Sequence, residues 1–214
     1  MPSTDSNTQP EEPKDRGRAT GGRSPNPAYE LFVLGELMGG PQYGYRLHRI
    51  IQRILGPFHR LSWGTLYPLI RRLEQQELLT SEIEARDPAS PQEEGGQSRK
   101  VYYITENGRA RFFALMVDTG EYNPDYEDLF AVKLYRFSLL TPTQQLVILQ
   151  QYREYLAVLR EHYSSGSRRV VTNPGISEQE RPFILQLSDY HIHSFDAKLA
   201  WIDERIAALT EHQD

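Results

Sequence analysis

The stretch SWGTLYPLIRR, from Ser62 to Arg72, concentrates side chains that bind anions and hydrogen-bonding partners. Three hydroxyl groups, on Ser62, Thr65 and Tyr67, precede the guanidinium groups of Arg71 and Arg72. Proteins place hydroxyl and guanidinium groups against the phosphate oxygens and base edges of nucleic acids. The stretch therefore indicates a binding surface rather than bond-breaking chemistry.

A helix must position these groups, because apolar residues recur at helical spacing through the same stretch, at Leu66, Leu69, Ile70 and Leu73. Ser62 is the expected N-cap of this helix. Gly64 and Pro68 lie on its outer face and have two compatible interpretations. They set the turn into the helix, or else Gly64 lets the helix N-terminus approach a phosphate while the Pro68 ring gives a rigid exposed surface.

The charge of the chain is unevenly distributed. The formal net charge is −5, yet the segment from Pro41 to Leu73 holds six arginines and two histidines but no Asp or Glu. A basic face of this kind is the electrostatic footprint of a nucleic-acid binder, and an acidic average conceals it. A solvated basic helix face is the alternative interpretation.

The bulk composition excludes several classes of protein. Residues 1–27 are rich in Pro and Gly and nearly devoid of apolar side chains, which predicts a disordered tail. The chain has no cysteine and no apolar run that resembles a signal peptide. No stretch approaches the roughly 20 consecutive apolar residues that a membrane span needs. We therefore expect a cytoplasmic location and no membrane partner.

The order of the elements favours a winged helix-turn-helix in the first half of a mainly α chain. Helices are expected over 28–38 and 45–55, before the helix that follows Ser62. Two strands, 79–84 and 101–105, bracket a polar hairpin loop over 85–100 and form a two-stranded wing. Thr105 is the expected N-cap of a further helix that ends near Gly120.

The second half is predicted to be helical throughout. We expect one helix over 125–139 and a second that opens at Thr141-Pro142. A Ser/Gly/Asn/Pro break over 164–175 should separate it from a last helix over 177–209. The second helix shows a narrow apolar seam at Leu146, Leu149, Tyr152, Leu156, Leu159 and Tyr163. The last helix places Phe183, Leu187, Tyr190, Leu199, Ile202, Ile206 and Leu209 on a similar face. An intramolecular helical hairpin and an inter-subunit coiled coil both explain these seams.

Four motifs stand in order: the Leu-rich first helix, GGPQYGYRL from Gly39, SWGTLYPLIRRLEQQELL from Ser62 and RKVYYITENG from Arg99. Together they resemble the PadR family of bacterial transcriptional regulators over about residues 28–118. Two departures are a glutamate, Glu77, at the usual glycine before Leu78, and a long wing that carries Glu93 and Glu94. The resemblance implies a DNA-binding domain over 28–120 and a helical dimerisation domain over 121–214, after the disordered tail over 1–27 that the composition predicts.

The resemblance also implies how such a protein works. It implies a homodimer that binds double-stranded operator DNA and represses a nearby operon, with release by small phenolic acids in some members. The candidate DNA contacts in this chain are Tyr43, Ser62, Gly64, Thr65, Tyr67, Arg71, Arg72, Arg99 and Lys100. For Trp63, a position in the core is favoured over one facing DNA.

Other functions find less support in the residues. His191 and His193 form an H-x-H pair near Asp196, but side chains two apart on a helix point about 200° from each other and cannot chelate one ion. The chain holds no G-x-S-x-G, P-loop or H-E-x-x-H motif, so we expect neither an enzyme nor a cofactor. A winged helix that contacts protein or RNA instead of DNA stays open as the alternative.

Overall fold

The computed structural model describes residues 26–56, 62–84, 99–118 and 120–211. The predicted disordered tail and hairpin loop lie almost wholly outside these residues. The described elements are α1 (Pro27–Met38), β1 (Gln42–Tyr43), α2 (Gly44–Leu55), α3 (Trp63–Gln75), β2 (Leu79–Glu84), β3 (Arg99–Ile104), α4 (Glu106–Val117), α5 (Tyr126–Tyr135), a 3-10 turn (Phe137–Leu139), α6 (Pro142–Thr172) and α7 (Arg181–Glu211). The chain is mainly α-helical with a small antiparallel sheet, as the sequence predicts.

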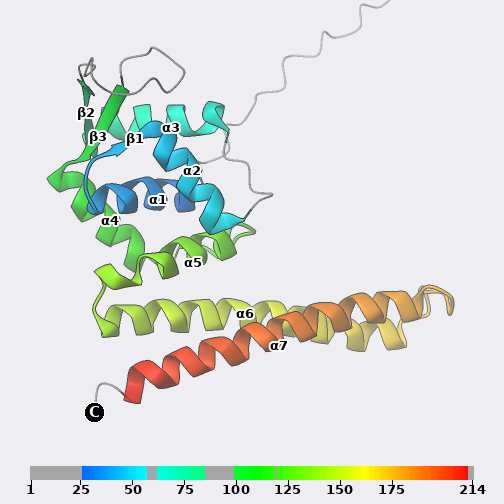
Figure 1. Ribbon diagram of the computed structural model, residues 1–214. Helices are drawn as coiled ribbons and strands as arrows, with labels where there is room; N and C mark the ends of the chain where they lie inside the picture. Colours follow the sequence, from blue (N-terminus) through cyan, green and yellow to red (C-terminus); the bar gives the residue numbers. More distant parts are fainter. Residues whose placement is uncertain (1–25, 57–61, 85–98, 119, 212–214) are drawn as a thin grey trace, which may run out of the picture.

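Helix α1 lies at the centre of the N-terminal half and packs against α4 and α5, both of which lie below it in Figure 1. It is buried on nearly all sides rather than on one face, and its burial includes Glu30 and Glu36. Glu30 accepts hydrogen bonds from Arg72 on α3 and Arg111 on α4, and Glu36 is paired with Arg136. Buried carboxylates cost free energy unless they are paired, so these arginines tie three surrounding segments to α1.

Helix α3 buries the four predicted apolar residues and ends in a Schellman turn, four residues before the predicted strand. The amide of Leu78 donates to the Leu73 carbonyl at 2.9 Å, and that of Glu77 donates to the Glu74 carbonyl at 3.0 Å. Glu77 has a φ of +57°, the left-handed conformation that glycine adopts without strain. The departure from the family motif therefore falls on the one position of this turn that requires positive φ.

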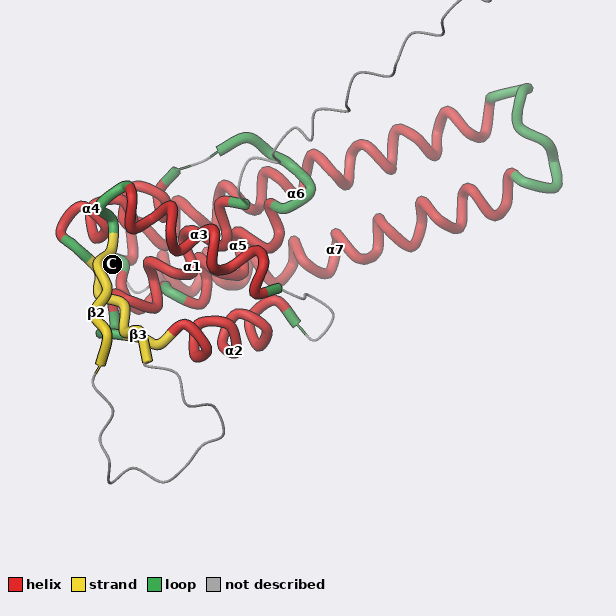
Figure 2. The backbone as a smooth tube through the Cα atoms, turned by 90° about the horizontal axis from the view of Figure 1, so that it is seen from above, coloured by secondary structure: helices red, strands yellow, loops and turns green. Residues whose placement is uncertain are grey.

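The sheet has three strands in the order β1-β3-β2, of which β2 and β3 form the wing (Figure 2). Strand β2 spans the predicted residues, and β3 begins two residues earlier than predicted. Strand β1 was not predicted, and the sheet is therefore not two-stranded: Gln42 pairs with Tyr102 and Tyr43 with Val101. The third strand fixes the start of α2 to the base of the wing.

Residues at the start of α4 contact the turn that ends α3. Thr105 caps α4 by accepting from the Gly108 amide at 3.0 Å, as predicted, and its hydroxyl also donates to the Glu77 carbonyl at 2.7 Å. A Cβ placed on Gly108 would lie 2.0 Å from the Leu78 carbonyl oxygen, so only glycine permits this approach. The glycine of the YITENG motif is therefore a packing requirement.

The predicted helix over 125–139 is wrong only in its last four residues, 136–139. Helix α5 ends at Tyr135, and a 3-10 turn over Phe137–Leu139 follows. Arg136 stands at the break, where its guanidinium pairs with Glu36 of α1. Helix α5 packs against α1 and α2 as well as α6, so it joins the winged helix to the C-terminal helices. The predicted domain division near residue 120 stays a prediction.

Helices α6 and α7 form an antiparallel hairpin that projects away from the winged helix (Figures 1 and 2). Each has 31 residues, and a helix of that length spans about 46 Å. Thr141 and Gln144 form a capping box that starts α6. The predicted break over 164–175 is wrong for most of its length, because α6 continues to Thr172.

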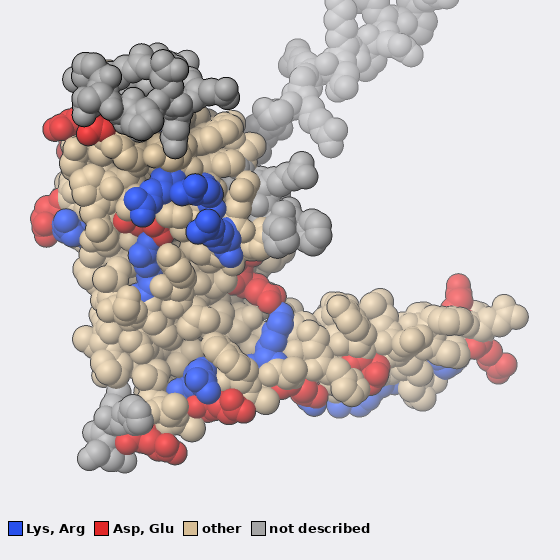
Figure 3. Space-filling model, viewed as in Figure 1, with Lys and Arg blue, Asp and Glu red and all other residues tan. Residues whose placement is uncertain are grey.

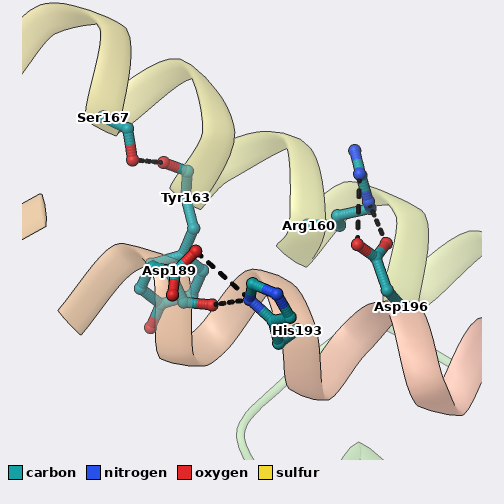
Figure 4. Close-up of polar contacts among 6 residues, drawn as sticks. All are labelled: Arg160, Tyr163, Ser167, Asp189, His193 and Asp196. Atoms are coloured by element: carbon teal, nitrogen blue, oxygen red, sulfur yellow. Dashed lines mark hydrogen bonds and ion pairs between the residues drawn. The ribbon is translucent and has the colours of Figure 1, made fainter. Parts of the chain in front are cut away.

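Two kinds of polar contact hold the hairpin and carry α6 through its Ser/Gly stretch. The Ser165 hydroxyl donates to the His162 carbonyl within the helix. The Ser167 hydroxyl donates to the Tyr163 carbonyl (Figure 4). At the far end, Arg181 of α7 donates to the carbonyls of Val170, Val171, Asn173 and Ile176. This guanidinium satisfies the carbonyls that a helix C-terminus leaves unpaired.

The predicted apolar face of α7 divides into two surfaces. Leu199, Ile202, Ile206 and Leu209 pack onto the core, as the helical-hairpin interpretation predicts. Phe183, Leu187 and Tyr190 do not, with 70%, 57% and 68% of their surfaces exposed. The second group therefore forms an apolar surface that the chain itself does not cover.

Candidate nucleic-acid interface

The N-terminal end of α3 is exposed and polar. Ser62, Gly64, Thr65, Tyr67 and Pro68 are all exposed there, while Leu66 between them is buried. Ser62 occupies the N-cap position, but its side chain makes no capping hydrogen bond and instead lies 3.0 Å from the Thr65 hydroxyl. Ser62 is thus the N-cap residue, as predicted, but its side chain does not bond the helix, and the first amides of α3 lack a side-chain partner.

Gly64 is not required by the packing of the chain. A Cβ placed there would meet only the Ser62 hydroxyl oxygen, at an ordinary contact distance of 3.5 Å, and its φ is not positive. In an α-helix the Gly64 carbonyl would accept from residue 68, which is a proline without an amide hydrogen. Gly64 and Pro68 therefore leave backbone without a covering side chain at the surface of the helix. The Gly64 amide, in the first turn, and the Gly64 carbonyl both lack their usual partner within the helix.

An aromatic stack joins α2 to this end of α3. The His48 ring lies 4.2 Å from the Trp63 ring at an interplanar angle of 13°, and Trp63 lies 5.2 Å from Tyr67 at 23°. Trp63 is 40% exposed, so the favoured prediction of a core position is wrong. The stack restrains the ring of Tyr67, and both Trp63 and Tyr67 remain partly exposed to solvent.

His48 and Tyr45 belong to the same surface and were not predicted. They stand one helical turn apart on α2, next to buried Leu47, and the Tyr45 ring stacks on Tyr43 at 5.5 Å. The spacing of the buried residues in α2 contains this signal, because it assigns the intervening residues to an outer face. The Tyr43 hydroxyl donates to Glu84 at 2.6 Å, which links β1 to the outer end of β2.

The two predicted arginines of α3 face different surroundings. Arg71 is exposed and, among the residues that the structure describes, no carboxylate lies within ion-pair distance of it. Arg72 turns inward and donates to Glu30 at 3.1 Å. Arg72 therefore stabilises the packing of α3 on α1, and Arg71 is the guanidinium that can reach an external anion.

The base of the wing contributes one described cation. Lys100 binds Glu74 of α3 at 2.9 Å and lies over the Tyr102 ring at 5.3 Å, with its side chain half-exposed. Burial alone would raise the pKa of Glu74, but hydrogen bonds from Ser81 and Lys100 and the charges of Lys100 and Arg71 lower it. Glu74 thus stays ionised and holds the wing against α3. The Arg99 backbone begins β3, and its side chain lies outside the described part.

The predicted contacts thus gather at two places. Tyr43, Ser62, Gly64, Thr65 and Tyr67 lie where the starts of α2 and α3 meet, since a Cβ on Gly44 would come within 3.8 Å of the Tyr67 ring. Arg71 lies one turn further along α3, and Lys100 stands at the wing. Three helices with an exposed third helix and an adjacent β-hairpin define a winged helix-turn-helix, a class that places the third helix in the major groove of DNA.

A comparison with known families matches the sequence of the winged helix. Residues 33–114 match the family model of the transcriptional regulator PadR-like family. Over this segment the chain is similar to PadR-like transcriptional regulators, as its motifs predict. That family consists of regulators rather than enzymes. No curated protein matches the chain.

Several solved structures are similar to the chain. PadR of Bacillus subtilis in complex with operator DNA is 15% identical, covers 84% of this chain and 98% of its own, and has a TM-score of 0.38. The same protein in complex with p-coumaric acid is 15% identical, covers 86% of this chain and 99% of its own, and has a TM-score of 0.36. The virulence activator AphA of Vibrio cholerae is 20% identical, covers 86% of this chain and 99% of its own, and has a TM-score of 0.34. At TM-scores below 0.5 the family assignment rests on the matched segment and its motifs.

The histidine pair of α7 takes part in two separate contacts. His191 stacks on Tyr163 of α6, with 4.2 Å between the ring centres. His193 lies 3.2 Å from the Asp189 carboxylate (Figure 4). Asp196 pairs with Arg160 of α6 instead of either histidine. The described residues contain no group of three or more His, Cys, Asp and Glu side chains placed to hold a metal ion. None of the helices in the described ranges is long and apolar enough to cross a membrane.

Proposed function

We propose that this regulator binds double-stranded operator DNA as a homodimer and represses a nearby operon. The observation that carries the proposal is the exposed start of α3, with uncapped amides, an unobstructed Gly64 and a guanidinium at Arg71. The N-terminus of a helix attracts anions through its unpaired N–H groups and its dipole. A DNA phosphate placed there would supply the hydrogen bonds that the Ser62 side chain does not.

Within this proposal the contacts divide by role. Gly64 and the adjacent amides hold a phosphate, and Arg71, Lys100 and Arg99 add phosphate charge pairing. The hydroxyls of Tyr43, Ser62, Thr65 and Tyr67 reach base edges or phosphates, and Trp63 with His48 orients Tyr67. Arg72 acts through the fold rather than on DNA, because its guanidinium is bound to Glu30.

Two variants separate these roles. Arg71→Ala should weaken binding to operator and random duplexes alike and reduce the slope of log affinity against log salt by about one. Tyr67→Phe should weaken the operator complex more than the random one, because a lost base contact costs about 1–3 kcal/mol of discrimination. Fluorescence anisotropy at several salt concentrations measures both. Equal losses for Tyr67→Phe on both duplexes would remove it from base reading, and no duplex binding at any salt concentration would favour a protein- or RNA-binding module.

The proposed dimer uses the uncovered face of α7. Phe183, Leu187, Tyr190 and Trp201 follow one heptad seam, since 183, 187, 190, 194, 197 and 201 are separated by alternating steps of four and three residues. All four named side chains are exposed in the single chain. One recognition helix reads few base pairs, so pairing two copies through this seam would provide two half-sites.

Oligomeric state tests the seam directly. Leu187→Glu should convert the dimer to a monomer in light scattering and weaken operator binding at low protein concentration. Gln186→Glu introduces the same charge at the adjacent exposed position and should leave the dimer intact. A dimeric Leu187→Glu variant would place the interface elsewhere on the chain.

Repression and its relief form the last part of the proposal. The PadR structure with p-coumaric acid motivates release by a phenolic effector. A reporter under the adjacent promoter should be more active when the gene for this chain is deleted, and a screen of phenolic acids for release of bound operator tests the effector. Lower reporter activity after deletion would make the protein an activator.

A further inference from the structure

A groove between α2 and α5 has no role in the contacts proposed above. Its volume is about 600 Å³, and it is lined by Arg46, Arg49, Ile50, Arg53 and Ile54 of α2 and by Ala131, Leu134 and Tyr135 of α5. Small-molecule sites in proteins have volumes of about 300–1,000 Å³. The groove is therefore large enough for a metabolite of nucleotide size.

The charge of the groove comes from one row of arginines. Arg46, Arg49 and Arg53 are spaced three and four residues apart, so their side chains project from one face of α2. In Figure 3 Lys and Arg side chains gather on the face of the molecule over α2. Like charges at this spacing repel one another, and an anion bound between them would remove that cost.

The acidic groups nearby do not neutralise this row. Within the described ranges, no carboxylate lies within ion-pair distance of Arg49 or Arg53. Arg46 acts electrostatically on Glu36, but the carboxylate of Glu36 is itself hydrogen-bonded to Arg136. The groove therefore presents at least two guanidinium groups whose donors are open to a ligand.

The remaining lining is apolar and aromatic. Ile50, Ile54 and Leu134 are partly buried against the core and form an aliphatic surface beneath the arginines. Tyr135 is about half exposed, and the Arg136 guanidinium lies 4.7 Å from the centre of its ring. Apolar surface of this kind favours a ligand with a flat hydrophobic part beside its charges.

We propose that the groove binds a small organic polyanion, namely a planar ring that carries two or more negative charges on phosphate or carboxylate groups. Each guanidinium fork matches a phosphate or carboxylate with two parallel hydrogen bonds. A single carboxylate would satisfy only one of the arginines, which distinguishes this ligand class from simple phenolic acids. The ring packs on Ile50, Ile54 and Leu134, and the charges face Arg49 and Arg53.

The position of the groove gives the ligand a regulatory consequence. Helix α2 belongs to the winged helix, and α5 connects that unit to the α6–α7 hairpin. A ligand that binds both helices stabilises one angle between the winged helix and the hairpin, and so one spacing of the two recognition helices. This consequence rests on the proposed function, whereas ligand binding itself does not.

Four probes applied to the full-length protein without DNA test the ligand class by isothermal titration calorimetry. Adenosine triphosphate and benzene-1,3,5-tricarboxylate combine a ring with several charges, one through phosphate and the other through carboxylate. Inorganic tripolyphosphate has charge without a ring, and p-coumarate has a ring with one negative charge. We expect at least one of the first two to bind about tenfold or more tightly than tripolyphosphate and p-coumarate. Equal or weaker binding of both would overturn the proposal.

Variants of the groove test its location. Arg49→Gln/Arg53→Gln should weaken binding of the preferred probe by about a hundredfold, because each charge-assisted hydrogen bond accounts for about tenfold or more. Ile54→Trp should block the groove without changing charge. The control Arg168→Gln/Arg169→Gln makes the same change in charge at the distal end of α6 and should bind as the wild type does. Unchanged binding in both groove variants, or equal loss in the control, would overturn the site.

Operator DNA supplies the remaining test. The Arg49→Gln/Arg53→Gln variant should bind operator DNA as the wild type does when no ligand is present. A loss of DNA affinity would show that the DNA backbone occupies the arginines, and would overturn the proposal. Failure of the proposed function is distinguishable, because Arg71→Ala is measured on DNA without ligand and calorimetry is measured on ligand without DNA.

Discussion

Replacing Gly64 with alanine should strengthen the fold and weaken DNA binding. An alanine Cβ at this position meets only the Ser62 hydroxyl oxygen, at 3.5 Å, so the folded chain accommodates it without movement. Alanine is favoured over glycine within helices by about 0.5–1 kcal/mol. For a chain of this size such a gain raises the unfolding midpoint by about 1–4 °C.

The same methyl group occupies space that the proposal assigns to DNA. A Cβ at the second position of α3 would hold a phosphate away from the uncapped amides. One lost charge-assisted hydrogen bond costs about 1.5–3 kcal/mol, which corresponds to a loss of about 10- to 150-fold in operator affinity. Because neutral amides make this contact, the salt slope should stay as it is in the wild type, unlike that of Arg71→Ala.

Differential scanning fluorimetry and DNA-binding anisotropy, carried out on the same preparation, measure the two opposite effects. Gly166→Ala is the matched control, because Gly166 lies within α6 and has nothing within 4 Å of the position of its added Cβ. It should stabilise the fold by a similar amount and leave operator affinity unchanged. If Gly64→Ala binds the operator as tightly as Gly166→Ala does, DNA does not approach this end of α3.

Three further substitutions test the packing around the site. Glu77→Gly should stabilise the chain by about 1 kcal/mol in urea unfolding, since it relieves a φ of +57°, and Glu77→Ala should show no such gain. Gly108→Ala should destabilise the same transition by more than about 3 kcal/mol, because its methyl overlaps the Leu78 carbonyl oxygen; a smaller loss would mean that α4 moves easily. Lys133 is only 2% exposed, and burial lowers its pKa from 10.5 to about 8. Between pH 8 and 10.5 the unfolded chain therefore binds more protons than the folded chain, so the stability of the wild type rises with pH through that window. The free energy of unfolding of Lys133→Met minus that of the wild type should therefore be larger at pH 7 than at pH 10, by up to about 3 kcal/mol. A difference that does not change with pH would contradict a buried charge at Lys133.

Helices with strong local signals were predictable from the sequence. The apolar spacing in α2 and α3, the Thr105 cap and the Thr141 capping box each depend on residues within one or two turns. Strand β2 was predicted with its bounds because alternating residues and turn signals surround it. Local sequence carried enough information wherever the deciding contacts were local.

Features that depend on distant contacts were not predictable. Strand β1 has two residues and exists only through pairing with β3, so it offers no alternation to detect. Helix α6 continues through its Ser/Gly stretch because α7 packs along it and Arg181 binds its last carbonyls. The predicted 125–139 helix breaks beside Arg136, whose partner lies on α1.

The candidate site showed the same division. Residue types and order placed the hydroxyls of α3 on an exposed face, but they could not show that Arg72 is bound to Glu30 or that Ser62 bonds Thr65. Trp63 stacks on the His48 ring of another helix, a contact that the residues around Trp63 do not reveal. Partnerships between helices decide which side chains remain open to a ligand.

The two ends of α3 differ in how firmly they are held. Its C-terminal end is bound by the Schellman turn, by Thr105 and by the contacts of Glu74 with Ser81 and Lys100, whereas its first turn lacks a side-chain cap. Local opening free energies should therefore fall along the helix toward Ser62. Amide hydrogen exchange should be slow near Leu73 and fast at the first turn. The end proposed to read DNA would then gain the most order on binding, and part of the binding free energy would be used to complete the helix.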